Sequence, residues 1–205
     1  MPVGSRPMSP KQRRGEQTAD RLPAAALEVY ADRGPEGFTM SAVIAESAVS
    51  NGSFYHHFGD LDGLAAALYT RCMTELLDAL AAALQDAPTA RDRLRALVVA
   101  YLRFTQEHRA AAHFIHASSY ASFLPAHAGA IAAAKAPKIE AILAWLRPHV
   151  QAGRVVDLPG PLTEMLVIGP VAETSRRWLA GTPGIDLTQA SRLLPERIWN
   201  SLNTR

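Results

Sequence analysis

A twenty-residue stretch, residues 39–58 (TMSAVIAESAVSNGSFYHHF), constrains the fold of this chain more than any other segment. It reads as two very short helices joined by a tight turn, and Thr39 and Ser50 are suited to cap their N-termini. Phe54 and Phe58 lie four residues apart, so they share one face of the second helix, which must point inward. Helices this short are not stable alone, so the pair must be held against a supporting core.

The outer faces of the second short helix carry polar and aromatic residues that suit contact with DNA. A tight turn followed by a helix presented to the major groove is the arrangement of a helix-turn-helix motif. Asparagine can pair bidentately with adenine, serine can bond either base type, and tyrosine and histidine can reach phosphates. The alternative is an ordinary helical hairpin with a polar surface. The residues available to the outer faces are Asn51, Ser53, Tyr55, His56 and His57, and Gly52 lets a partner's backbone approach closely.

Residues from about Arg21 to Tyr69 resemble the N-terminal domain of the TetR family of transcriptional regulators. The most specific part is the run from Ser50 to Phe58 (SNGSFYHHF). The other matching residues are Ala25-Ala26, Val29-Tyr30, Gly34, Gly37-Phe38-Thr39, Val43, Val49 and Leu64. The resemblance implies an all-α protein with an N-terminal three-helix helix-turn-helix DNA-binding domain and a helical effector-binding and dimerisation domain. We place a flexible basic arm at residues 1–15, the DNA-binding domain at 16–69 and the ligand-binding and dimerisation domain at 70–205.

Residues and resemblance together give a predicted set of DNA contacts, in which Asn51, Ser53 and His56 read bases. Tyr55 and His57 contact phosphates by analogy with the family, and Thr39 and Ser50 anchor helix ends at phosphates. The complete predicted DNA-binding set is Thr39, Ser50, Asn51, Gly52, Ser53, Tyr55, His56 and His57.

The chain departs from the family pattern at three positions. Ala48 replaces the usual turn glycine and is expected to adopt a conformation that alanine allows. Leu61 lies between two aspartates where a phosphate-binding lysine often follows. Pro23 occupies an apolar position of the first helix, which is therefore expected to start near Asp20 or to kink at the proline.

Composition supports a helical protein with a substantial core, because 48% of the residues are hydrophobic and β-branched runs are scarce. The formal net charge is only +2. Four basic residues fall within the first fourteen, whereas residues 15–59 hold two arginines against six acidic residues. The basic N-terminal segment could therefore supply phosphate or minor-groove contacts, or be a solvated tail. No apolar run approaches the ~20 residues of a membrane helix, and the N-terminus lacks the pattern of a signal peptide, so we expect a cytoplasmic protein without membrane contact.

Breakers and apolar periodicity predict the remaining helices. The first helix should run from about Gln17 to Arg33. The later helices should span roughly residues 61–86, 89–108, 110–123, 126–151 (interrupted by Pro137 and Pro148), 162–179 and 187–202. Wide apolar arcs on the last two indicate burial on two sides. The resemblance to the TetR family favours dimerisation through them, and the alternative is simple packing in the monomer core. A dimer would place two reading helices one DNA turn apart, about 34–36 Å, on a near-palindromic operator.

Aromatic and histidine residues in the middle of the chain suggest a small-molecule pocket with apolar walls and a few polar groups. In TetR-like proteins this region binds an effector, and binding tilts the long helix that follows the DNA-binding domain. The alternative is that many of these side chains are ordinary core. The predicted ligand-binding set is Tyr101, Phe104, His113, His116, Tyr120, Trp145 and Trp178.

The sequence offers little support for an enzyme. His113 and His116 share a helical face, but no acidic residue lies between Glu107 and Glu140, so we predict no metal and no cofactor. No phosphate-binding glycine loop or nucleophile elbow is present. The single cysteine, Cys72, falls in an apolar helical pattern and is interpreted as a small buried hydrophobe, the alternative being a thiol sensor.

The predicted function is therefore that of a TetR-like, homodimeric transcriptional regulator, a repressor released from double-stranded DNA by a small apolar or aromatic effector. Two alternatives stay open. One is an effector-independent DNA-binding activator. The other is a helical small-molecule-binding protein or enzyme that has lost DNA binding.

Overall fold

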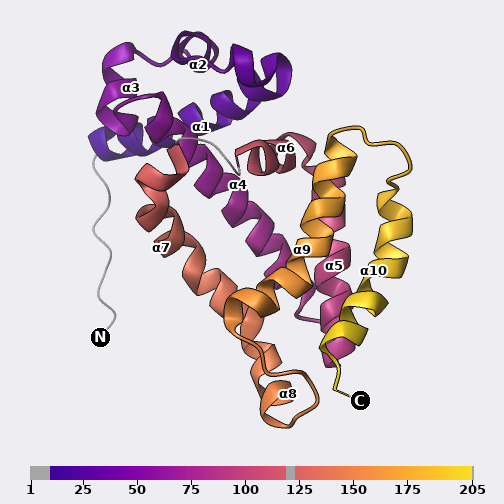
Figure 1. Cartoon of the computed structure of the whole chain (residues 1–205). Coiled ribbons are helices and arrows are strands. Elements are labelled where there is room, and N and C mark those ends of the chain that lie inside the picture. The colour runs from indigo at the N-terminus through magenta and orange to yellow at the C-terminus, as the bar shows by residue number, and fades with distance from the viewer. Residues whose placement is uncertain (1–9, 119–122, 205) are drawn as a thin grey trace, which may run out of the picture.

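Three helices form the N-terminal unit, and two of them are the short helices of the motif. The computed structural model describes residues 10–118 and 123–204, with side chains from residue 20 onward. Helices α2 (Met40–Ser47) and α3 (Asn51–Phe58) pack against α1 (Pro10–Gly37), as Figure 1 shows. We call these three helices the reading head.

The first helix begins earlier than predicted. It starts at Pro10 rather than near Gln17, so part of the predicted arm is helical, while residues 1–9 lie outside the described residues. It also runs through Pro23 with helical dihedral angles, so the expected start near Asp20 was wrong. Proline has no backbone N–H, so the helix lacks one hydrogen bond at this position. The helical turns on both sides of Pro23 maintain the helix despite this loss. The regular helix breaks at Gly34 (φ 66°, ψ −171°), directly after Arg33, where the first helix was predicted to end.

Side-chain caps fix the ends of the short helices. The Thr39 hydroxyl accepts the Ala42 N–H at 3.3 Å, and the Ser50 hydroxyl accepts the Ser53 N–H at 3.3 Å, which confirms both predicted caps. Between them, Ala48 has φ 53° and ψ 30°, in the left-handed region. This is the small left-handed region that alanine allows at an energetic cost, and the turn geometry requires this positive φ whichever residue is present.

Eight further elements complete the described chain. They are α4 (Leu61–Ala83), α5 (Ala90–Glu107), α6 (Arg109–Ala117), α7 (Phe123–Leu143), the 3₁₀ turn η2 (Ala144–Leu146), α8 (Arg147–Gln151), α9 (Gly160–Leu179) and α10 (Leu187–Leu202). Helices α4 and α7 run side by side away from the reading head, while α5 and α9 run back toward it (Figure 1). Within the described ranges, the one β-type pairing is an antiparallel bridge between Val155 and Asn203.

Prolines limited the helices less than predicted. Helix α6 ends at Ala117, earlier than expected, and α7 already begins at Phe123. Pro125 therefore lies in the first turn of α7, where a proline is tolerated, and α7 continues through Pro137 to Leu143. Pro148 lies in the first turn of α8, after the interruption at η2.

Helix α4 carries a buried stripe along its whole length. The residues predicted every four positions, Leu64, Leu68, Cys72, Leu76, Leu80 and Leu84, are all buried. Cys72 has no exposed surface, and burial raises the pKa of its thiol to about 12. A sensor thiol must be accessible and readily ionised, so the sensor interpretation of Cys72 was wrong and the buried-hydrophobe interpretation is confirmed. Among the described helices, none is long and apolar enough to cross a bilayer.

Candidate nucleic-acid interface and ligand cleft

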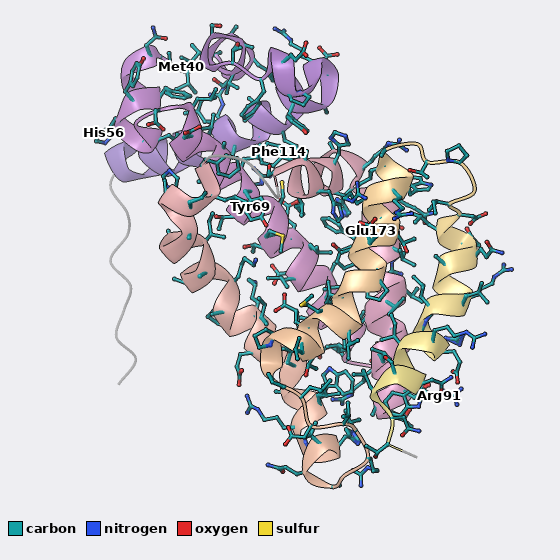
Figure 2. All side chains as sticks on the ribbon, in the orientation of Figure 1. Met40, His56, Tyr69, Arg91, Phe114 and Glu173 are labelled. Atoms are coloured by element: carbon teal, nitrogen blue, oxygen red, sulfur yellow. The ribbon has the colours of Figure 1, made fainter. Side chains whose placement is uncertain are left out.

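The second short helix is clamped on one side and open on the other. Phe54 has no exposed surface and Phe58 is half-buried, so the aromatic face packs inward as predicted. The side chains of Asn51 and Tyr55 are exposed, Tyr55 by 52%. His56 projects at the outer edge of the molecule, as Figure 2 shows. The arrangement leaves a row of hydrogen-bonding groups facing outward.

The other predicted DNA contacts differ in their exposure. Thr39, Ser50 and Gly52 are exposed, whereas Ser53 and His57 are half-buried. His57 lines an open groove of about 1000 Å³ that runs between α1, the end of α3, α4 and α7. The eight predicted residues therefore do not form one uniform face, and His57 also faces the rest of the protein.

The helix-turn-helix motif offers DNA more backbone and hydroxyl groups than cationic side chains. Arg21 donates from Nη2 to the carbonyl oxygen of Ser47 at 2.9 Å, which satisfies an otherwise open acceptor at the end of α2. Arg33 forms an ion pair with Asp32, with Nε 3.6 Å from Oδ2. Helices α2 and α3 contain no lysine or arginine. The caps at Thr39 and Ser50 use the hydroxyl oxygens as acceptors. The O–H of Ser50 therefore remains able to donate to phosphate, whereas the hydroxyl of Thr39 also lies 3.2 Å from Ser41 Oγ.

An aromatic contact joins the reading head to the helical domain. The ring of Tyr30 on α1 meets the ring of Phe114 on α6 edge-on, with centroids 4.8 Å apart, and contacts Phe38 at 5.9 Å. His113 lies beside the same tyrosine at 5.7 Å. The position of α6 is thereby linked to that of α1.

The predicted ligand-binding residues do not converge on one cavity. Phe104 stacks on His108 at 4.7 Å, Trp178 lies beneath the guanidinium of Arg109 at 4.6 Å, and His113 is exposed beside the reading head. Trp145 lies in η2, with its indole N–H buried and without a partner in the described chain. Tyr120 lies outside the described residues. Local partners therefore hold most of these aromatic residues away from a shared site.

An apolar cleft does exist, and Tyr101 is the predicted residue that lines it. It lies between α4, α5, α7 and α9 and has a volume of about 90 Å³. Its walls are mostly aliphatic and were not predicted as a site, because leucine and isoleucine at helical spacing look like ordinary core. The lining residues are Met73, Leu76, Leu77, Leu80, Leu97, Tyr101, Lys135, Ile139, Ile142, Leu143, Glu164, Val167 and Ile168. Lys135 could have been noticed, because it is the one charged residue in the run from Leu124 to Pro137.

His116 lies close to the ring of Tyr101, with centroids 6.4 Å apart, but does not line the cleft. Burial, with a smaller effect of Arg176, lowers the pKa of His116 to about 4, so its imidazole is neutral near pH 7. Across residues 10–118 and 123–204, no group of three or more His, Cys, Asp or Glu side chains is placed to hold a metal ion.

Each of the last two helices leaves apolar side chains exposed. Leu162, Met165 and Leu166 on α9 and Leu193 on α10 are exposed by 48%, 66%, 36% and 56%. By contrast, Ile198 and Leu202, which belong to the same predicted apolar arc, are buried in the core of the chain.

Comparison with known proteins agrees with this geometry. Residues 22–68 match the model of the family described as bacterial regulatory proteins, tetR family. The HTH-type transcriptional activator FasR of Mycolicibacterium smegmatis is 25% identical over 201 residues, which cover 92% of this chain and 89% of that protein.

Two solved structures share the fold over nearly their whole length. A TetR family transcription regulator from Marinobacter aquaeolei VT8 superposes with a TM-score of 0.72 at 18% identity, covering 95% of this chain and all of the other. The regulator FadR of Bacillus subtilis, in complex with stearoyl-CoA, gives a TM-score of 0.71 at 19% identity, covering 87% of this chain and 96% of that one.

A capped helix-turn-helix pair on a three-helix reading head, followed by a helical domain with an internal cleft, defines a DNA-binding transcriptional regulator. The family match falls on the reading head itself, where the sequence resemblance had also been found. The N-terminal domain belongs to the TetR family of bacterial regulators, and the comparisons over the whole chain support a TetR family regulator.

Proposed function

We propose that the chain is a homodimeric repressor that binds a near-palindromic operator and leaves it when an apolar effector fills the cleft. The observation that carries this proposal is the dual role of α4. Leu64 on this helix is buried in the core beside the reading head, and Leu76, Leu77 and Leu80 on the same helix line the cleft. A ligand that separates the walls of the cleft must therefore act on the helix that supports the reading head.

At the operator, α3 enters the major groove with Asn51, Ser53 and His56 directed at base edges. Tyr55 and His57 contact phosphates, as do the open N-termini of α2 and α3 at Thr39 and Ser50. The exposure of Asn51, Tyr55 and His56 supports these roles. Because α2 and α3 carry no lysine or arginine, hydrogen bonds supply most of the contacts of this motif.

The dimer forms through the exposed apolar side of α9 and α10. Met165 and Leu166 on α9, together with Leu193 on α10, supply the contact, and their exposure in a single chain supports it. An isologous contact of this kind gives two-fold symmetry, which a near-palindromic operator matches.

The effector is aliphatic rather than aromatic. A cleft of about 90 Å³ with leucine and isoleucine walls suits a slender chain better than a ring system. This volume is below the range of about 300–1000 Å³ usual for ligand sites, so binding must widen the cleft. The similar FadR of Bacillus subtilis was solved with stearoyl-CoA, which carries a long alkyl chain.

Activation of transcription is the second candidate, and the likeness to the transcriptional activator FasR favours it. Both modes use the same DNA contacts. They differ in whether transcription rises or falls when the protein occupies its site.

A DNA-binding measurement tests the proposal. Fluorescence anisotropy with the DNA upstream of the chain's own gene should give saturable binding that exceeds binding to a shuffled control sequence. Affinity should fall as the salt concentration is raised, because phosphate contacts release counterions from the DNA. Equal affinity for both sequences would contradict operator binding, and a reporter gene driven by the same DNA distinguishes repression from activation.

A further inference from the structure

The apolar cleft has different chemistry at its two ends. Helix α7 runs away from the reading head and α9 runs toward it (Figure 1). The order of residues along these helices therefore places Lys135 at the end of the cleft nearer the reading head, and Glu164 at the far end. Tyr101, late in the returning helix α5, also lies toward the near end. Between the ends the walls are aliphatic.

Lys135 has no partner for its charge in the described part of the chain. The other lysine of α7, Lys138, pairs with Asp78 of α4, and Glu140 pairs with Arg147. Lys135 is half-buried, yet it forms no ion pair and no hydrogen bond with a described residue, Glu164 included. An ammonium group partly removed from water gains from an anionic partner.

The hydroxyl of Tyr101 is the second unpartnered polar group. Tyr101 is only 5% exposed, it lines the cleft, and it makes no side-chain hydrogen bond to another described residue. A phenol O–H in such a place is a donor that awaits an acceptor. One cation and one O–H donor therefore mark the same end of an otherwise aliphatic cleft.

We propose that the cleft binds a single alkyl chain that ends in a carboxylate. The carboxylate oxygens accept hydrogen bonds from the Lys135 ammonium and the Tyr101 O–H, and the chain extends along Leu77, Ile139 and Ile142. Glu164 at the far end disfavours a second anionic group, so a monocarboxylate binds better than a dicarboxylate of equal length. The inference rests on the proposed function only in taking this cleft as the effector site.

Direct binding to the full chain without DNA tests the assignment. Isothermal titration with dodecanoate, dodecanol, dodecylamine and dodecanedioate, each below its micelle concentration, compares end groups on one chain length. Dodecanoate should bind about ten-fold or more tighter than dodecanol, the ratio that one charge-assisted hydrogen bond supplies. Preference for the alcohol, the amine or the diacid would overturn the inference.

Variants identify the residues responsible. Lys135→Met should reduce the preference for dodecanoate over dodecanol to about two-fold or less, the residual from one neutral hydrogen bond. Lys138→Met, one turn further along α7, removes a cation that already has Asp78 as its partner and should leave the preference unchanged. Tyr101→Phe keeps the ring and should lower the affinity for dodecanoate while sparing dodecanol. Full preference retained in both Lys135→Met and Tyr101→Phe would overturn the assignment.

Dodecanoyl-CoA separates the free acid from a thioester as the source of the chain. Tighter binding of the thioester, with no dependence on Lys135, would place the anion elsewhere and overturn the inference. Failure of the proposed function is distinguishable from this outcome. If the protein binds no operator but prefers dodecanoate in a Lys135-dependent way, only the regulator mechanism is refuted. If it binds the operator but lacks that preference, only the ligand assignment is refuted.

Discussion

The carbonyl oxygen of Phe58, the last residue of α3, lies directly against the α-carbon of Gly63 in α4. A Cβ atom added at Gly63 would be 2.0 Å from that oxygen. In the same turn, the Asp60 carboxylate accepts the Gly63 N–H at 2.7 Å. The end of the reading helix and the start of α4 are therefore packed backbone to backbone, and lack of space, not a special dihedral angle, requires glycine at this position.

Gly63→Ala is expected to destabilise the protein by about 1–3 kcal/mol, because the added methyl group must separate α3 from α4. Affinity for the operator should fall as well, since α3 would shift relative to α1. Urea unfolding and anisotropy measure the two effects. Gly129→Ala on α7 is the matched control, because a Cβ there meets nothing within 4 Å, and it should be neutral or slightly stabilising. Equal stability of the two variants would contradict the packing argument.

Ala48→Gly is expected to stabilise the chain by about 1 kcal/mol. Ala48 holds φ 53° in the turn of the motif, and the left-handed region costs an L-residue with a Cβ about 1–2 kcal/mol. Part of that gain is lost to the greater freedom of glycine in the unfolded chain. Denaturant midpoints give the difference. The control is Ala45→Gly within α2, which should be destabilising by a similar amount, and a loss of stability in Ala48→Gly would show that the turn strain is overestimated.

Stability is expected to fall as the pH is lowered from about 6.5 to 4. The pKa of His116 is about 4 in the folded protein, because of burial, and near 6.5 in an unfolded chain. Between these pH values the imidazole is protonated in the unfolded state but not in the folded state. The free energy of unfolding can therefore fall by about 3 kcal/mol. The low pKa of Glu173, held down by Arg176 and Arg177, acts mainly at still lower pH. His116→Leu should flatten the dependence of stability on pH, measured by urea unfolding at each pH. An unchanged slope would show that other groups cause this dependence.

Asn51→Ala is expected to cost about 1–3 kcal/mol of affinity at the operator and to relax the preference at one base pair. The side chain is exposed at the start of α3, where it can reach a base edge. Tyr55→Phe should instead weaken binding to all sequences alike, because a phosphate contact carries no sequence information. Binding measured across a set of single-base operator variants separates the two. An unchanged preference in Asn51→Ala would refute its base-reading role.

Local chemistry made much of the fold predictable. Thr39, Ser50 and Asp60 cap their helices as their hydroxyl and carboxylate groups favour, and the last helix spans residues 187–202 as its apolar period indicates. The failures came where tertiary packing outweighed a local preference. Helix α7 continues through Pro137, where the sequence predicted an interruption.

The site was predictable only where its chemistry differs from that of a core. The outward face of α3 could be read from the positions left over once Phe54 and Phe58 point inward. The cleft could not, because its leucine and isoleucine walls have the same periodicity as packed residues. Large aromatic residues looked like better candidates from their chemistry, yet Phe104 stacks on His108, four residues further along the chain. Trp178 is covered by Arg109, a neighbour that only the folded chain brings to it.

The 23 residues of α4 form one uninterrupted helix of about 34 Å. Its first turns pack against the helix-turn-helix motif and its later turns line the cleft. The position of the motif and the shape of the cleft therefore cannot vary independently. A substitution that adapts the cleft to a new compound will also change operator occupancy before any compound is present. A change of effector preference in such a chain therefore requires two substitutions. One admits the new molecule to the cleft, and the other, elsewhere on α4, restores the affinity for the operator in the absence of effector.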